Sequence, residues 1–219
     1  MRVQTMKDAL GERDIMDVLL WHERNFLPRV LRLKNYYTGN HDILSKAQRS
    51  NNAPNNRIVA NYCEYIANMS TGFFMGQPVA YSSISGDTEA VKALQDVFRY
   101  NDEAEGNLQL AGESSVTGAA YEVLYLDADA EIRFCSIPAE QMILVTDSTL
   151  EENIVAAIRC YRVLGLDGSS YRDYVDVYDA QTVTSYDYNA ANLVRTTSTA
   201  FPSSSIRITR RGAATLRGS

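Results

Sequence analysis

Two histidines, His22 and His41, are the residues around which acid–base or metal chemistry would have to be built in this chain. His22 and Glu23 resemble the start of a zinc-protease helix, but the residue four positions after His22 is Phe26. The second imidazole that a zinc site on one helix face requires is therefore missing. We interpret His22 as a residue on the flank of a helix and predict no metal site.

The other patterns that could do chemistry are incomplete. The run GESSVTG at residues 112–118 contains serines, but it lacks the spacing of a nucleophile elbow and a histidine nearby. The chain contains neither a Walker-type phosphate loop nor the glycine pattern of a dinucleotide fold. Asp127, Asp129 and Glu131 lack the glycine and terminal glutamate of a calcium loop, so we predict a solvated hairpin turn there. The sequence predicts no catalytic residue and no cofactor.

Composition predicts a folded protein without a strong attraction for nucleic acid. The 219 residues are 45% hydrophobic and 22% charged, with a net charge of -6. Such a chain can bury a sizeable core, and its acidity argues against a freestanding protein that grips duplex DNA. The charge is uneven: residues 1–60 carry ten basic and six acidic side chains, whereas residues 61–200 carry seven and twenty-one.

Cysteine usage and the N-terminus indicate the cytoplasm as the place of synthesis. Cys63, Cys135 and Cys160 are odd in number and far apart, which favours neither a disulfide framework nor a zinc knuckle. The sequence has no apolar stretch near the ~20 residues of a membrane helix. Its first residues lack the apolar region of a signal peptide, so we expect no membrane partner.

Periodicity predicts helices first and strands afterwards. Apolar residues at three-to-four spacing predict a helix from Asp14 to Tyr37, kinked at Pro28 and closed by Gly39 or Asn40. Further helices are expected over Asn56–Thr71, with Asn55 or Asn56 as its cap, from Asp87, and over Glu103–Ala120.

From residue 121 the apolar period changes to two. It predicts strands within residues 121–127, 131–138, 142–147, 154–163, 171–180 and 182–189. The fold class is therefore α+β, with N-terminal long helices followed by an antiparallel β-meander. Half-buried tyrosines with hydroxyls in water are expected in these strands: Tyr161, Tyr171, Tyr174, Tyr178, Tyr186 and Tyr188.

Three stretches of the sequence resemble the portal proteins of siphophage-type tailed bacteriophages. They are YYTGNHDIL at residues 36–44, NNRIVANYCEYIANMSTGFFMGQPVAYSS at 55–83, and GAAYEVLYLDADAEIRFCSIPAEQMILVTD at 118–147. The resemblance runs in consistent order from about residue 14 to about residue 197. The structural signature falls on Gly39, Asn56, Ile58, Gly72, Gly76, Pro78, Tyr81 and Pro138.

The residue types of this signature are expected to set backbone geometry and to take no part in catalysis. Gly39, Gly72 and Gly76 can adopt positive φ and so fix the angles between helices and the following extended stretch. Pro78 sets a rigid extended entry. Phe73 and Phe74 are expected to cover the junction between the helix and that stretch.

The resemblance implies a structural role in the virion. Portal proteins form a homo-oligomeric ring of about twelve subunits at one capsid vertex, made in the host cytoplasm from a phage or prophage gene. DNA passes through the ring without sequence-specific binding, and terminase, scaffold or capsid, and head-completion proteins contact it. The present sequence corresponds to the wing, divided into a helical part (1–120) and an antiparallel β part (121–200). The stem, clip, tunnel loop and crown would follow, so terminase docking and DNA gating are not carried over.

Residues 201–219 differ in texture from the rest, because FPSSSIRITRRGAATLRGS contains neither an acidic residue nor a tyrosine. One permitted set of codons for residues 201–217, read from the third nucleotide, yields PLIEYPNNEEGRGDFE, which is similar to what portal proteins carry next. We therefore expect an aberrant or disordered tail produced by a frameshift or truncation. The alternatives to a portal subunit are an uncharacterised soluble enzyme and a monomeric binding module, both of α+β fold.

Overall fold

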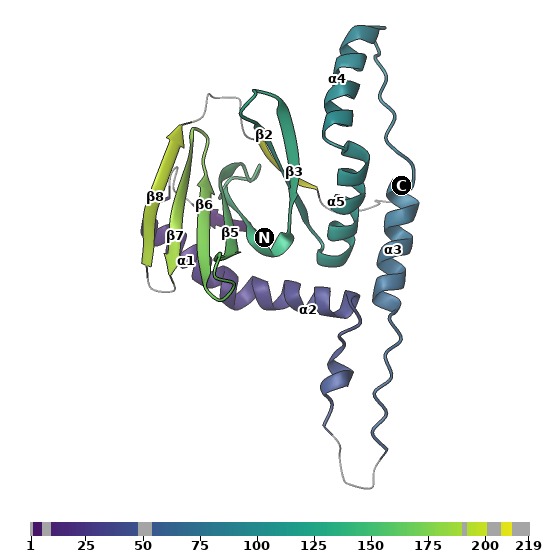
Figure 1. Cartoon of the computed structure of the whole chain (residues 1–219), viewed down its shortest axis with the longest axis vertical. Coiled ribbons are helices and arrows are strands. Elements are labelled where there is room, and N and C mark those ends of the chain that lie inside the picture. The colour runs from purple at the N-terminus through teal and green to yellow at the C-terminus, as the bar shows by residue number, and fades with distance from the viewer. Residues whose placement is uncertain (1, 6–9, 48–53, 190–191, 201–206, 212–219) are drawn as a thin grey trace. The chain divides into compact units, whose positions relative to one another are not determined.

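The computed structural model describes residues 2–5, 10–47, 54–189, 192–200 and 207–211 (Figure 1). The chain forms two compact units. Residues 1–28 and 121–210 form the first, which we call the strand-rich unit. Residues 29–120 form the second, which we call the helical unit. The helix that precedes residue 28 therefore folds with the strands that follow residue 120.

The long N-terminal helix consists of three consecutive segments. Helix α1 covers Glu12–Trp21, a π-helical turn η1 covers His22–Phe26, and α2 covers Leu27–Tyr37. In the π turn, the Leu27 N–H donates to the carbonyl of His22, five residues back. Pro28 was predicted to disturb this helix. In a regular α-helix the proline ring would clash with the carbonyl four residues earlier. The wider turn just before Pro28 relieves that clash.

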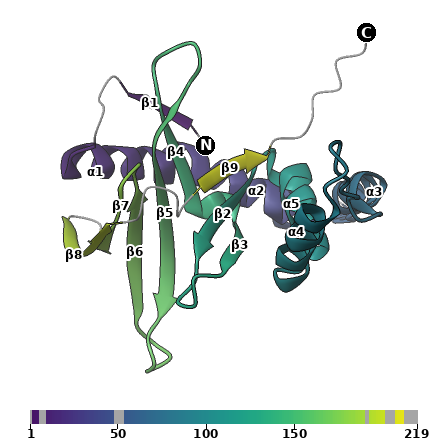
Figure 2. The same cartoon turned by 90° about the horizontal axis from the view of Figure 1, so that it is seen from above.

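The larger sheet has six strands in the order β1-β4-β5-β6-β7-β8 (Figure 2). Strands β4 to β8 form an antiparallel meander, with each strand paired to the next, and β4 to β7 of it were predicted. Strand β8 and strand β1, which pairs parallel with β4, were not predicted. The bounds are Arg2–Thr5, Met142–Asp147, Ile154–Leu164, Tyr171–Tyr178, Thr182–Asn189 and Asn192–Ala200.

The smaller sheet has the order β3-β2-β9, with bounds Ile132–Ile137, Ala120–Leu126 and Arg207–Arg211. Strands β2 and β3 form a hairpin whose turn contains Asp127. The Asp127 carboxylate accepts the N–H groups of Asp129 and Glu131, each at 3.0 Å, and the latter two side chains are exposed. This confirms the predicted solvated turn. The rest of the expected tail, residues 201–206 and 212–219, lies outside the described residues.

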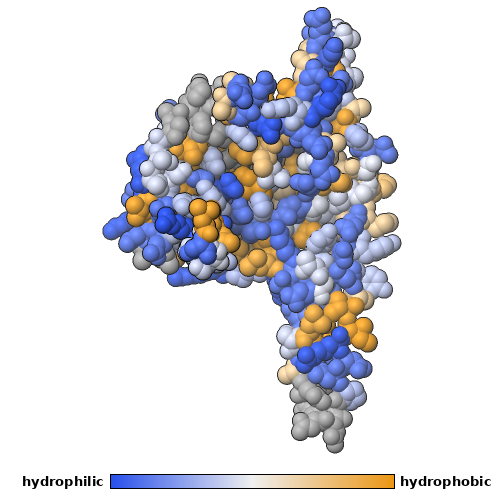
Figure 3. All heavy atoms as spheres, viewed as in Figure 1, coloured by the Kyte–Doolittle hydropathy of each residue, from blue (hydrophilic) through white to orange (hydrophobic). Residues whose placement is uncertain are grey.

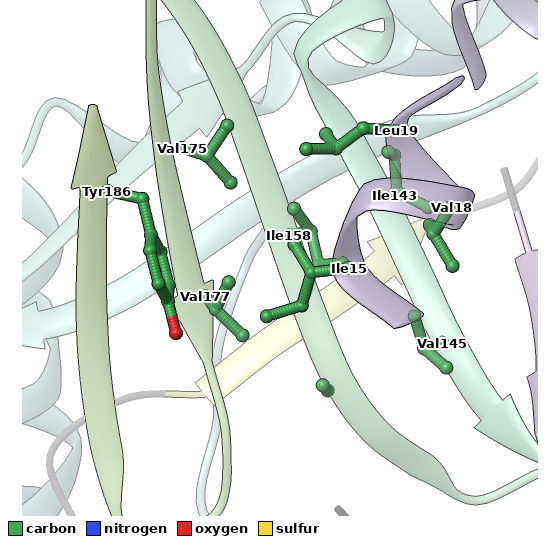
Figure 4. Close-up of a cluster of buried hydrophobic side chains, with 10 residues drawn as sticks. Ile15, Val18, Leu19, Ile143, Val145, Ile158, Val175, Val177 and Tyr186 are labelled. Carbon is green, nitrogen blue, oxygen red and sulfur yellow. The ribbon is translucent and has the colours of Figure 1, made fainter. Parts of the chain in front are cut away.

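The core of the strand-rich unit lies between α1 and one face of the six-stranded sheet (Figure 4). Ile15, Val18 and Leu19 on α1 meet aliphatic side chains from β4, β5 and β6, and Tyr186 on β7 closes the cluster. Ile143 and Ile158 are fully buried. The alternation of strand residues produces this arrangement, since every second side chain points to the α1 face. The structure confirms the α+β class.

The helical unit contains α3 (Tyr62–Met75), α4 (Thr88–Tyr100), α5 (Glu103–Thr117) and a 3₁₀ turn, η2 (Asp42–Ser45). Asp87 caps α4 as predicted, because its carboxylate accepts the Ala90 N–H at 3.0 Å. Helix α5 ends at Thr117, three residues earlier than predicted, because Gly118 with a φ of 80° terminates it. Helix α3 packs against α5, where Ala67 is buried and Thr71 lies beside Gly112.

Candidate functional site

The joint between α2 and α3 is the first place where signature residues gather. Gly39 follows α2 with a φ of 82°, which confirms the predicted left-handed end of the helix. Asn61 Nδ2 donates to the Tyr37 carbonyl at 2.9 Å, and the Tyr37 hydroxyl donates to Asn68 Oδ1 at 2.9 Å. The Asn61 side chain also accepts the Glu64 N–H at 3.5 Å and so caps α3. One asparagine therefore connects the end of one helix to the start of the next.

The predicted cap at Asn55 or Asn56 is wrong. Helix α3 begins at Tyr62, and residues 54–61 have no regular secondary structure. The side chain of Ile58 is 77% exposed in this segment, where Arg57 Nη2 donates to the Lys46 carbonyl at 2.9 Å. The sequence signal for the true start was present: an asparagine followed three residues later by Glu64 is the spacing of a capping box.

The joint between α3 and α4 contains Gly76, Pro78 and Tyr81, and Gly72 lies one turn earlier, inside α3. The expectation of positive φ at Gly72 and Gly76 is wrong, since Gly72 lies within α3 and the φ of Gly76 is -70°. Gly76 is required for space instead, because an added Cβ would overlap the Gly72 carbonyl oxygen.

Phe73 and Phe74 do not cover this joint. They are 96% and 64% exposed, which corrects the sequence expectation. The physical reason is that α3 continues through Gly72 to Met75. Both rings are therefore carried on a helical surface and not on a turn folded over the junction.

Tyr81 ties the segment after α3 to the two following helices. Its hydroxyl donates to Glu103 Oε1 on α5 at 2.7 Å, and its ring lies 4.6 Å from that of Phe98 on α4. Pro78 lies nearby in an open groove of about 340 Å³, which it lines together with Val79 and with Leu108 of α5. These contacts are structural, because they hold the chain segment between α3 and α4 against α5.

Pro138 lies in the strand-rich unit, between β3 and β4. Its carbonyl accepts the Gln141 N–H at 2.9 Å and closes the short 3₁₀ turn Ala139–Gln141. Ala139 is fully buried. Apart from Gly72, which lies inside α3, the residues of the predicted signature occupy turns and connecting segments in both units. The structure does not gather them into one cavity.

The two histidines have different surroundings. His22 is only 3% exposed, and its ring centroid lies 5.3 Å from that of Phe26, so the predicted position on a helix flank is wrong. Burial lowers the pKa of His22 to about 4, which keeps the ring neutral. His41 stacks on the ring of Tyr36 at 4.7 Å, and its Nε2 lies 3.0 Å from the Tyr36 carbonyl. Within residues 10–47, 54–189 and the shorter described stretches, no group of three potential metal ligands comes together.

The outward face of α3 is a surface that the sequence analysis did not foresee. Its large apolar side chains are more than half exposed: Tyr62, Tyr65, Ile66, Met69 and Phe73. Figure 3 shows hydrophobic side chains on the surface of the helical unit. An open groove of about 640 Å³ runs along one flank of this face. Tyr65, Met69 and Phe73 belong to both, and the other residues that line the groove are Asn61, Glu64, Asn68 and Gly72. Periodicity predicts a helix in this part of the chain, but it does not predict which of its apolar side chains another element covers.

None of the helices described in the structure combines the length and apolar character needed to cross a bilayer.

Comparison with known proteins adds the identity of the chain. No curated protein sequence matches it. A family model described as "Phage portal protein, SPP1 Gp6-like" matches residues 17–205. This match extends through both compact units and includes every signature residue named above. This match confirms the resemblance drawn from the stretches at residues 36–44, 55–83 and 118–147. The chain belongs to the SPP1 Gp6-like family of phage portal proteins.

Proposed function

We propose that this chain is the wing-forming part of a portal subunit and assembles into a ring at the capsid vertex. In this role the ring is the conduit through which DNA is packaged and ejected, and it is the point of head–tail attachment. The observation that carries the proposal is the family match over residues 17–205. The placement of Gly39, Tyr81 and Pro138 supports it, because these signature residues lie at a helix end, at a contact between helices and in a strand connection.

The electrostatics are consistent with a conduit that does not grip DNA. The net charge of -6 and the fourteen-charge acidic excess of residues 61–200, with twenty-one acidic and seven basic side chains, repel a phosphate backbone. In this proposal DNA passes through the ring without sequence-specific contacts. The partners are further copies of the chain, together with terminase, scaffold or capsid, and head-completion proteins.

Gene context and electron microscopy test the function. A large-terminase gene beside this gene, and ring-shaped particles when the reading frame is expressed with the rest of the portal sequence, are the expected results. We predict that the 219-residue chain alone is a monomer or a weak, heterogeneous oligomer, because a closed ring needs repeated head-to-tail contacts. Sedimentation as a stable closed ring would contradict that prediction, and a gene neighbourhood of metabolic enzymes would contradict the portal function.

The reading-frame hypothesis for residues 201–219 has its own test. The nucleotide sequence that encodes residues 201–217 should read as portal-like protein when it is translated from the third nucleotide of the Phe201 codon. Stop codons or unrelated residues in that frame would refute the hypothesis. They would leave the family assignment intact, since most of the match lies before residue 201.

A further inference from the structure

Most large apolar side chains of helix α3 lie on the side that faces away from α5. The side that faces α5 carries small residues, the buried Ala67 and Thr71. Tyr62, Ile66, Met69 and Phe73 recur at intervals of four, three and four residues and therefore form one stripe. At about 100° per residue, this stripe is centred roughly opposite the Thr71 side of the helix. The helix thus turns its small side chains inward and its aromatic and aliphatic ones outward.

The exposure along this stripe is high at every position. Tyr62 is 69% exposed, Ile66 61%, Met69 59% and Phe73 96%, and the neighbouring Tyr65 is 61% exposed. Side chains of this size present on the order of 700 Å² of surface, more than a monomeric soluble protein ordinarily exposes in one apolar patch. The area is close to the ~800 Å² that each partner contributes to a standard protein interface.

The composition of the face resembles the centre of a protein interface. The exposed residues Tyr62, Tyr65, Ile66, Met69 and Phe73 carry no charge. In the groove on the flank of this face only Glu64 is charged, and its carboxylate accepts a hydrogen bond from Asn61 Nδ2 at 2.8 Å. Tyrosine, phenylalanine and methionine are enriched at interface cores, where charged residues are depleted. Leu150 and Leu166 differ from this pattern, because they are exposed singly in turns of the strand-rich unit, and such isolated residues are common.

We propose that the outward stripe of α3 is a contact surface between neighbouring copies of this chain. The proposal rests on the ring function proposed above, and a second copy is the occupant because a ring subunit must contact its neighbours. A head-to-tail contact joins two different surfaces of the same protein, so the stripe on α3 need not match itself. Its area is sufficient for one side of such an interface.

Sedimentation velocity of the 219-residue chain over a wide concentration range tests the contribution of the stripe. Met69→Glu places a charge in the middle of the stripe and Phe73→Glu places one at its end, and neither residue is buried. The matched controls are Ile84→Glu, in the helical unit, and Leu166→Glu, in the strand-rich unit, because both residues are fully exposed. We expect the weight-average sedimentation coefficient of the wild-type and control chains to rise with concentration. The two α3 variants should sediment as monomers with unchanged circular dichroism.

A photo-crosslinker gives a local reading of the same contact. Benzoylphenylalanine replaces Phe73 in one sample and Leu166 in the other, and covalent dimers are mapped by mass spectrometry after irradiation. The Phe73 sample should give dimers attached at a defined surface of the second copy, whereas the Leu166 sample should give few.

Three results would overturn the assignment of α3. They are a chain that forms no dimer by either method, α3 variants that associate like the wild type, and controls that lose association equally. None of these results bears on gene context or on rings formed by the longer portal reading frame, so failure of the interface is distinguishable from failure of the portal function.

Discussion

The strand-rich and helical units differ in where they keep their large apolar side chains. In the strand-rich unit, α1 and strands β4 to β7 enclose a continuous cluster in which Ile143, Ile158 and Val175 are fully buried. Among the described residues of the helical unit, the buried apolar residues are Val30, Leu110 and several alanines. Its aromatic residues lie mostly at the surface. The comparison shows a closed apolar core in one unit and large apolar side chains left at the surface in the other.

Truncating one isoleucine to alanine in each unit should give the largest difference in the free energy of unfolding. Ile158→Ala should lower the free energy of unfolding by about 2–5 kcal/mol, because it leaves a cavity between α1 and the sheet. Ile66→Ala, on the exposed stripe, should change it by no more than about 0.5 kcal/mol. Urea denaturation followed by circular dichroism measures both. Equal losses would refute the contrast between the units.

The pH dependence of stability sharpens the assignment of the core. The folded pKa of His22 is lowered to about 4, below the unfolded value of 6.5. Between these values the unfolded chain binds the extra proton, so this contribution to stability is complete above pH 6.5 and is lost as the pH falls toward 4. His22→Phe should lose less stability over that interval than the wild type. Parallel denaturation curves for the two proteins across this range would contradict a buried, neutral imidazole.

A smaller contrast separates two glycines of the helical unit. Gly39→Ala should destabilise by about 1–2 kcal/mol, because its φ of 82° is costly for a residue with a side chain. Gly72→Ala should instead stabilise by about 0.5–1 kcal/mol, since Gly72 lies inside α3 with open space around its Cα. Thermal unfolding and hydrogen exchange of residues 35–75 provide the measurement. Destabilisation by both changes would show that α3 needs glycine at position 72, which would contradict the helical conformation and open surroundings of this residue.

Elements with a strong local pattern could be predicted from the sequence. The six predicted strands are short apolar or alternating runs between turn residues, and Asp87 marks the start of α4 as its cap. Strand β1 escaped because four residues carry little pattern and its partner β4 lies far along the chain. His22 follows Ile15 by seven residues and Leu19 by three, which places all three on one helix face. Its burial could therefore have been predicted from this spacing.

The candidate site was less predictable than the fold. The glycine and proline positions were found from sequence because turns depend on local residue types, and Tyr81 was found through the resemblance to portal proteins. The roles of Gly72 and Gly76 were assigned wrongly, since whether a glycine provides a backbone angle or a close approach depends on neighbours in space. No local sequence pattern predicts that the apolar stripe of α3 faces outward. This orientation follows from which side of the helix α5 contacts.

The π turn at His22–Phe26 has a consequence for the history of the family. A turn closed between Leu27 and His22 contains one residue more than an α-helical turn would. Portal sequences that lack a proline at the position of Pro28 have no clash to relieve there. Where such relatives keep a regular helix, alignment with this chain will place a single-residue gap within these five positions.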